Sequence, residues 1–294
     1  MIVVAGGSGL LGRHLVAGIL SRGQQVAVLV RDMTRAESLF GGAVDVRGGD
    51  VRHRDGLDAR VAGAGVVVSA VHGLLGGRGA GPAAVDERGN ANLIDAAAKA
   101  GAHVVLVSVC GASADHPLDL FRAKYAAEQH LRASRAPWTI VRAPAYLETW
   151  LAVLDSTAGS TGRPLVFGRG VQPIPFASVI DVAAVVARAA VDPSLRGRVL
   201  DIAGDAITMN SLADALKSAR GWQGASRHLP RGMLRALSTL ARPVSPAFAR
   251  KNRMALAMDV GTVSTPVTDA FPLESPQTLP EVLAGFGSAV AVHK

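Results

Sequence analysis

The clearest chemical signal in the chain is a cluster of glycines within its first twelve residues. They follow a short apolar run and precede a segment whose apolar residues recur at helical spacing, which predicts a strand, a tight turn and a helix. Glycines at this spacing let the chain reverse, let backbone amides approach a pyrophosphate, and let helix and strand pack closely. The phosphates then bind the free amides at the positive end of the helix. The spacing predicts a dinucleotide site made of Gly6, Gly7, Ser8, Gly9, Leu10, Leu11 and Gly12.

The end of the second predicted strand, residues 25–30, indicates which dinucleotide binds. An enzyme selective for NAD usually presents an acidic side chain here, about 20 residues past the glycine turn, to bond the ribose 2′-hydroxyl. This strand ends instead in Arg31, with Arg35 one helical turn further on, and such an arginine can pair with a 2′-phosphate. Asp32 is the opposing residue, because its carboxylate could face the ribose. We predict NADP(H) as the cofactor, with NAD the less favoured alternative.

Strands and helices alternate along the first two thirds of the chain. The run at residues 65–71 is almost wholly apolar, as a parallel strand buried on both faces should be. The alternation predicts an α/β fold with a doubly wound parallel sheet of the Rossmann type. We expect an NAD(P)-binding core over residues 1–150, to which residues 176–204 return. Residues 151–175 and 205–294 would form a smaller, mostly helical region that binds the substrate or acts as a lid.

The composition narrows the classes of protein that fit. Apolar runs are interrupted well before about 18 residues, so no membrane span is expected, and the first strand leaves no room for a signal peptide. A single cysteine, Cys110, excludes an intramolecular disulfide and a cysteine-rich zinc site, and fits a reducing cytoplasm. We therefore expect a cytoplasmic protein without a metal.

The net charge of +8 comes mostly from arginine, which we interpret as spread along the chain. It suits an anionic ligand such as a phosphorylated cofactor, although compositional drift explains it equally well. Aromatic residues make up only 4% of the chain, so a base-stacking surface and a nucleic-acid partner are not expected. We expect a small-molecule substrate, and a monomer or homodimer.

Several segments, taken in order, resemble one family: AGGSGLLG, VLVRD, GDV, VVVSAV, the Lys-x-x-x-Glu of Lys124 to Glu128, and WTIVRAPAYLE. They are similar to the atypical short-chain dehydrogenase/reductases, and most of all to their NmrA-like branch of NAD(P)H-binding reductases. The resemblance implies that the region after Pro144 builds most of the substrate pocket. It also implies a cofactor lined by Gly6, Gly9, Gly12, Arg31, Asp50, Val51, Ser69, Ala70, Val71, Lys124 and Pro144. From its position, Asp50 could instead be a helix cap.

The chain departs from the family pattern at the residue that usually moves the proton. In classical members, a Ser at the end of the fifth strand is followed by Tyr-x-x-x-Lys, and the Tyr donates or accepts the proton. Counted from Ser108, the Lys is Lys124 and the Tyr position is Leu120, whose side chain cannot exchange a proton. Tyr125 lies about 100° around the helix from Lys124, so it does not share its face.

The candidate catalytic residues are therefore Lys124 and Ser108, each with two open roles. Lys124 could act as the acid or base, as the Lys is thought to do in NmrA-like reductases, or it could only bind the ribose. Ser108 is either a hydroxyl that orients the substrate or a satisfied polar group at a strand end. Cys110 is interpreted as a small buried hydrophobe, and His116 as a surface loop residue.

Beyond residue 221 the resemblance thins and the sequence becomes basic and amphipathic. An apolar helical face is predicted for Leu229, Met233, Leu237 and Leu240, with arginines around it. Such helices can lie on membranes or grip partner helices, but we interpret these as a lid over an apolar ligand pocket.

Two classes of function fit these residues. The first is NADPH-dependent reduction of a small apolar substrate such as a quinone, an enone or a carbonyl, with Lys124 or water supplying the proton. The second is a non-catalytic NAD(P)(H)-binding sensor of the NmrA type, which the missing Tyr supports. We favour the enzyme.

Overall fold

The structure, a computed structural model, describes residues 1–263 and 267–290. It contains two compact units, each described by itself: unit 1 is residues 1–143 with 182–201, and unit 2 is residues 144–181 with 202–294. The division expected from the sequence, at residues 150, 175 and 204, differs from these boundaries by a few residues. Residues 264–266 and 291–294 of the expected C-terminal region lie outside the described residues.

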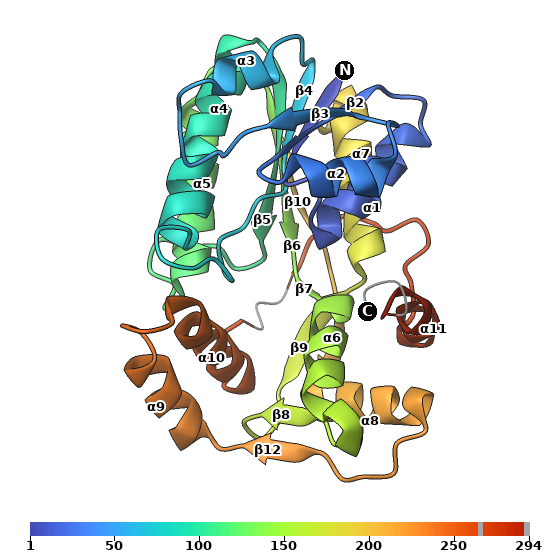
Figure 1. Cartoon of the computed structure of the whole chain (residues 1–294). Helices are drawn as coiled ribbons and strands as arrows, with labels where there is room; N and C mark the ends of the chain where they lie inside the picture. Colours follow the sequence, from blue (N-terminus) through green and yellow to red (C-terminus); the bar gives the residue numbers. More distant parts are fainter. Residues whose placement is uncertain (264–266, 291–294) are drawn as a thin grey trace. The chain divides into compact units, whose positions relative to one another are not determined.

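Unit 1 is built on a seven-stranded parallel sheet with the strand order β10-β6-β5-β4-β1-β2-β3 (Figure 1). Its strands are β1 (Ile2–Ala5), β2 (Val26–Val30), β3 (Asp45–Gly48), β4 (Val66–Ser69), β5 (His103–Val109), β6 (Trp138–Ala143) and β10 (Val199–Asp201). The strand order reverses between β1 and β4, which creates the switch point where open α/β sheets bind their ligands. The predicted doubly wound parallel fold is confirmed.

Helices cover both faces of this sheet, with α3, α4 and α5 on one face and α1 and α7 on the other (Figure 1). The helices are α1 (Leu10–Leu20), α2 (Met33–Phe40), α3 (Leu57–Val61), α4 (Asn90–Lys99), α5 (Asp119–Ala133) and α7 (Val179–Val191). A π-helical segment, Ala83–Gly89, runs directly into α4. The main core packs Leu93 and Ile94 of α4 and Leu131 of α5 against the sheet, all of them fully buried.

Unit 2 combines short strands with helices. The strands β11 (Asp205–Thr208), β9 (Pro173–Ala177) and β7 (Ala145–Tyr146) form one sheet, and β12 (Arg227–Leu229) pairs with β8 (Leu165–Phe167). The helices are α6 (Leu147–Ala158), α8 (Met209–Arg220), α9 (Arg231–Leu240), α10 (Pro246–Asp259) and α11 (Leu279–Val290). Leu151, Phe176 and Leu212 form the centre of its own apolar core.

Polar side chains bond to backbone amides at the start of two helices of unit 2. The Thr208 hydroxyl accepts a hydrogen bond from the Ser211 amide at 3.0 Å and caps α8. The amide and the hydroxyl of Thr278 both donate to the Glu281 carboxylate, which satisfies the Thr278 amide at the start of α11. Among the described residues, no helix is long and apolar enough to cross a membrane.

Candidate functional site

The glycine turn joins β1 to α1 at the switch point of the sheet. Gly6 has a φ of +84°, and a Cβ there would stand 2.8 Å from the carbonyl oxygen of Ala70, just past β4. A Cβ on Gly12 would overlap the Gly6 carbonyl oxygen. The N-cap residue of α1 is Gly9, which has no side chain to occupy the free amides of the first turn. These features fit a dinucleotide, whose pyrophosphate requires close backbone approach and unpaired amides.

The remaining residues of the phosphate loop fall into two groups. Gly7 and Leu11 are buried, and a Cβ on Gly7 would stand 2.6 Å from Cγ1 of Val28 in β2. Ser8 and Leu10 keep partial access to solvent, and the Gly9 between them is exposed. The turn therefore has a packed side and a side whose backbone a ligand can reach.

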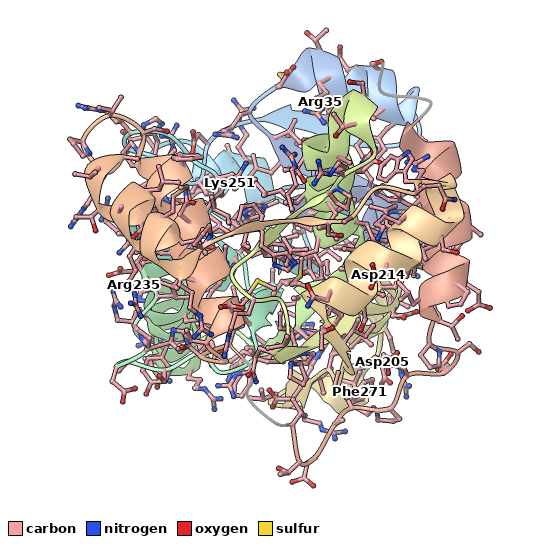
Figure 2. All side chains as sticks on the ribbon, turned by 90° about the horizontal axis from the view of Figure 1, so that it is seen from below. Arg35, Asp205, Asp214, Arg235, Lys251 and Phe271 are labelled. Atoms are coloured by element: carbon pink, nitrogen blue, oxygen red, sulfur yellow. The ribbon has the colours of Figure 1, made fainter. Side chains whose placement is uncertain are left out.

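Arg31 and Arg35 are exposed at the end of β2 and in the first turn of α2, where Figure 2 labels Arg35. Asp32 lies between them as the N-cap of α2, and its Oδ1 accepts a hydrogen bond from the Arg35 amide at 2.9 Å. Because the Asp32 carboxylate already caps a helix, its alternative role at a ribose hydroxyl is less favoured. The two guanidinium groups remain available to an anion.

Asp50 is held by an arginine and not by a helix amide. The Arg52 Nε donates to both carboxylate oxygens at 3.0 Å, and its Nη2 donates to Oδ2 at 2.6 Å. The Arg52 hydrogen bonds lower the pKa of Asp50. Arg52 also donates to the Gly79 carbonyl at 3.0 Å, so the Asp50–Arg52 pair links the end of β3 to the loop between β4 and the π-helical segment. The sequence reasoning missed Arg52, although its spacing of two residues from Asp50 was a visible signal.

Lys124 is buried between the ends of β4 and β5. Its Nζ donates to the carbonyl oxygens of Val71 and Val107, each at 2.9 Å, and lies 3.1 Å from Oδ1 of Asp86. The Lys124 side chain is 4% exposed and that of Asp86 is 0% exposed. Asp86 Oδ2 accepts a hydrogen bond from the Gly73 amide at 2.7 Å. The ion pair therefore connects two strand ends with the loop that follows β4.

Ser108 takes part in a second buried polar group. Its hydroxyl donates to Oε1 of Glu128 at 2.5 Å, and Glu128 lies one turn after Lys124 on α5. Arg142 donates to the same carboxylate through Nε at 2.9 Å and Nη2 at 2.6 Å. This geometry favours the interpretation of Ser108 as a satisfied polar group at a strand end over that of a hydroxyl that orients the substrate. Leu120, at the position of the missing Tyr, is buried in α5.

The expected cofactor residues at the end of β4 differ in access. Ser69 is fully buried and donates to Oδ1 of Asn90 at 2.5 Å, while Ala70 and Val71 are partly exposed. Val51 is buried beside α4, where its carbonyl accepts a hydrogen bond from Asn92. A ligand can thus reach Ala70 and Val71 directly, whereas Ser69 and Val51 support them from the interior. Pro144, the first residue of unit 2, is partly exposed.

Two histidines lie near the polar groups described above, one that the sequence analysis did not single out and one that it interpreted wrongly. His72, which it did not single out, follows Val71 and keeps solvent access. Desolvation lowers the pKa of His72, while the charge of Asp86 raises it and that of Lys124 lowers it. The interpretation of His116 as a surface loop residue is wrong: it is buried, and its ring stacks on Phe121 at a centroid distance of 4.0 Å.

Unit 2 contains a small pocket of its own, with free space at its centre of about 10 Å³, on the order of one water molecule. The lining is mostly aromatic and aliphatic, with two methionines that can adapt to different apolar ligands. It consists of Trp150, Phe167, Gly170, Gln172, Ile174, Met209, Ala255, Met258 and Asp259.

Asp259 is the charged residue of this pocket and organises the elements around it. Its Oδ1 accepts hydrogen bonds from the amides of Arg169 at 2.8 Å and Gly170 at 2.9 Å, and Arg231 of α9 donates to Oδ2. Burial raises the pKa of Asp259, but the hydrogen bonds from Arg231 and from the amides of Gly170 and Arg169 outweigh burial and lower it below its ordinary value. The carboxylate therefore ties α9 and α10 to the turn between β8 and β9.

Known proteins resemble this chain over most of its length. Its residues 6–193 match the model of a family described as NAD(P)H-binding. The chain is 28% identical to an NAD(P)H azoreductase of Xenophilus azovorans over 223 residues, which cover 75% of this chain and 74% of that protein. It is 26% identical to quinone oxidoreductase 2 of Escherichia coli (strain K12) over 226 residues, 76% of each chain.

The fold is similar to the crystal structure of an NADPH-dependent quinone oxidoreductase from Escherichia coli complexed with NADPH. The TM-score is 0.73 at 22% identity, over 98% of this chain and 100% of that chain. The sequence relatives are oxidoreductases, which supports the same class for this protein. Since the family model covers more than half of the chain, the resemblance seen in the sequence is confirmed, and the chain belongs to the NAD(P)H-binding family.

Proposed function

We propose that this chain is an NADPH-dependent oxidoreductase that reduces a small apolar organic substrate such as a quinone, an enone or another carbonyl. The observation that carries the proposal is the glycine turn, in which Gly6 and Gly12 have no room for a Cβ. Relatives named azoreductase and quinone oxidoreductase support the substrate class. When bound, NADPH supplies a hydride.

The chain's own residues would hold the cofactor at three points. The amides at the start of α1 bind the pyrophosphate, and Arg31 with Arg35 binds the 2′-phosphate through charge-assisted hydrogen bonds. Ala70 and Val71 provide the partly exposed strand end against which the cofactor lies.

Lys124 acts in this proposal as a positioning residue. Two hydrogen bonds and the ion pair with Asp86 already engage its ammonium group. Direct proton transfer from Lys124 would break that buried pair, so water supplies the proton to the reduced substrate. Ser108 of β5 and Arg142 of β6 both donate to Glu128 of α5, which holds the ends of these two strands together.

The proposal is tested by mixing the purified protein with NADPH and a panel of quinones, enones and aldehydes while following nicotinamide absorbance. We expect oxidation of NADPH by at least one member of the panel, and its loss in Gly12→Val, because a side chain there overlaps the turn. Gly232→Val is the matched control, since a Cβ at Gly232 would meet nothing within 4 Å.

A non-catalytic sensor is the second candidate, because Leu120 cannot donate a proton and Lys124 is already paired. If NADPH stabilises the protein against heat but no acceptor oxidises it, the enzyme proposal fails and the sensor replaces it. If NADPH does not bind at all, both fail.

A further inference from the structure

The excess of basic over acidic residues in this protein comes from one segment. Residues 215–258 contain nine Lys and Arg residues and no Asp or Glu, so the remainder has 22 basic against 23 acidic residues. Arginines are spread along the chain as expected, but those outside this segment are balanced by acidic residues. This segment includes α9, the turn after it and all of α10 except its last residue, Asp259.

The same segment leaves large apolar side chains uncovered. Met233 is 51% exposed, Leu240 74%, Val244 83% and Phe248 45%. The last three are spaced four residues apart across the end of α9, the turn and the start of α10. Four of the ten large apolar side chains that are exposed among the described residues therefore fall within residues 233–248. Such a concentration is typical of a surface that contacts a partner or a membrane.

Helix α9 has its apolar side turned to solvent. Met233, Leu237 and Leu240 share one side by helical spacing, yet Leu234, at the margin of that side, is the buried residue. The expectation that Leu229 lies on the same helical face is wrong, because Leu229 is the last residue of β12. The helix is held in this orientation through Arg231, which binds Asp259 at the end of α10.

Cations border this apolar surface. Arg235, Arg242 and Lys251 are exposed, and none of the three has an acidic partner among the described residues. Figure 2 shows Arg235 and Lys251 on the two neighbouring helices. We call this surface the basic hairpin: Met233, Arg235, Leu240, Arg242, Val244, Phe248 and Lys251.

We propose that the basic hairpin binds the surface of an anionic phospholipid bilayer. Such a surface offers negative headgroups to the cations and an apolar boundary to the exposed side chains at the same time. A nucleic acid would neutralise the cations but leave the apolar side chains in water. A second copy would cover the apolar side chains but bring like charges together.

The proposal also revises the interpretation of these helices as a lid. The pocket of unit 2 is lined from α10 by Ala255, Met258 and Asp259, and none of the exposed apolar side chains of the basic hairpin lines it. The inference does not depend on the proposed reaction.

The test is cosedimentation of the full chain with phosphatidylcholine vesicles that contain or lack phosphatidylserine, at low and at high ionic strength. The charge variant is Arg235→Gln with Arg242→Gln and Lys251→Gln. We expect about 100-fold weaker binding, at roughly fivefold for each cation near an anionic surface. The apolar variant, Leu240→Ser with Val244→Ser and Phe248→Ser, should bind at least about tenfold more weakly.

A matched control removes three exposed arginines of unit 1, as Arg135→Gln with Arg196→Gln and Arg198→Gln. This control should bind vesicles as the unaltered chain does. The charge variant, the apolar variant and the control should each unfold at the same temperature as the unaltered chain. Equal binding to both kinds of vesicle, no binding, or equal loss in the control overturns the proposal. Binding to an oligonucleotide but not to vesicles overturns it, as does self-association that the apolar variant abolishes without any vesicle binding.

Discussion

Unit 1 and the basic hairpin of unit 2 use charged side chains in opposite ways. In unit 1, Lys124 and Asp86 are almost completely buried against each other, and Glu128 is buried against Arg142. In the hairpin, Arg235 and Lys251 are exposed. The same residue types therefore stabilise the ends of strands in one region and face external partners in the other.

The difference follows from the cost of desolvation. A charge removed from water must be paired, so each buried pair restricts the backbone around it to one geometry. An exposed cation keeps its hydration, contributes little to stability, and remains free to attract an anion. Variants that remove charges should therefore affect stability in unit 1 and binding in the hairpin.

The largest expected effect is the loss of a buried partner. Lys124→Met leaves the Asp86 carboxylate buried without its cation and should lower the free energy of unfolding by about 3–5 kcal/mol. Urea denaturation measures this, and adding Asp86→Asn should restore much of the loss. Arg54→Gln, in the exposed Arg54–Asp58 pair, is the control and should leave the midpoint unchanged. If Lys124→Met and Arg54→Gln lowered the free energy of unfolding equally, the contrast between buried and exposed charges would be wrong.

The next largest effect is the pH dependence of stability that is expected from His103, which is buried and neutral in the folded chain. Burial lowers the pKa of His103 from 6.5 to about 4, and its Nε2 lies 3.0 Å from the Thr139 hydroxyl. The unfolded chain binds a proton near pH 6.5 but the folded chain does not until about pH 4. The contribution of neutral His103 to the free energy of unfolding is therefore complete above pH 6.5. It is lost as the pH falls toward 4, by about 3 kcal/mol in total.

Urea titrations across this pH range measure the effect. His103→Gln should flatten the decline in the free energy of unfolding. The same slope in the variant and the unaltered chain would assign the decline to other groups.

An exposed cation of unit 1 should instead act on a ligand, as those of the hairpin do. Arg31→Ala should weaken NADPH binding about tenfold, by the ~1.5 kcal/mol of one charge-assisted hydrogen bond, and leave NADH binding unchanged. Calorimetric titration with each nucleotide measures this, with Arg135→Ala as the control. Equal affinity of the unaltered protein for both nucleotides would exclude the role of Arg31.

The smallest effect on stability is expected in the basic hairpin. The variant that lacks the charges of Arg235, Arg242 and Lys251 should unfold at the same temperature as the unaltered chain, because exposed charges of this kind contribute little to the folded state. Differential scanning calorimetry checks this. A clear fall in that temperature would mean that these cations stabilise unit 2 and are not free for a partner.

Features that depend on neighbours along the chain could be predicted from the amino-acid sequence. They are the glycine turn, the arginine at the end of β2 and the replacement of the catalytic Tyr by Leu120. The parallel sheet could be predicted too, because strands alternate with helices.

Which polar groups contact one another depends on the tertiary structure. Asp86 reaches Lys124 because β4 and β5 are adjacent in the sheet and the π-helical segment packs against α5. The buried ring of His116 stacks on Phe121, and Arg231 joins α9 to Asp259 of α10 while Met233 and Leu240 stay exposed. Local spacing does not encode these contacts, since each joins side chains or elements that folding brings together, and burial then determines whether a charge is paired inside or left for a partner.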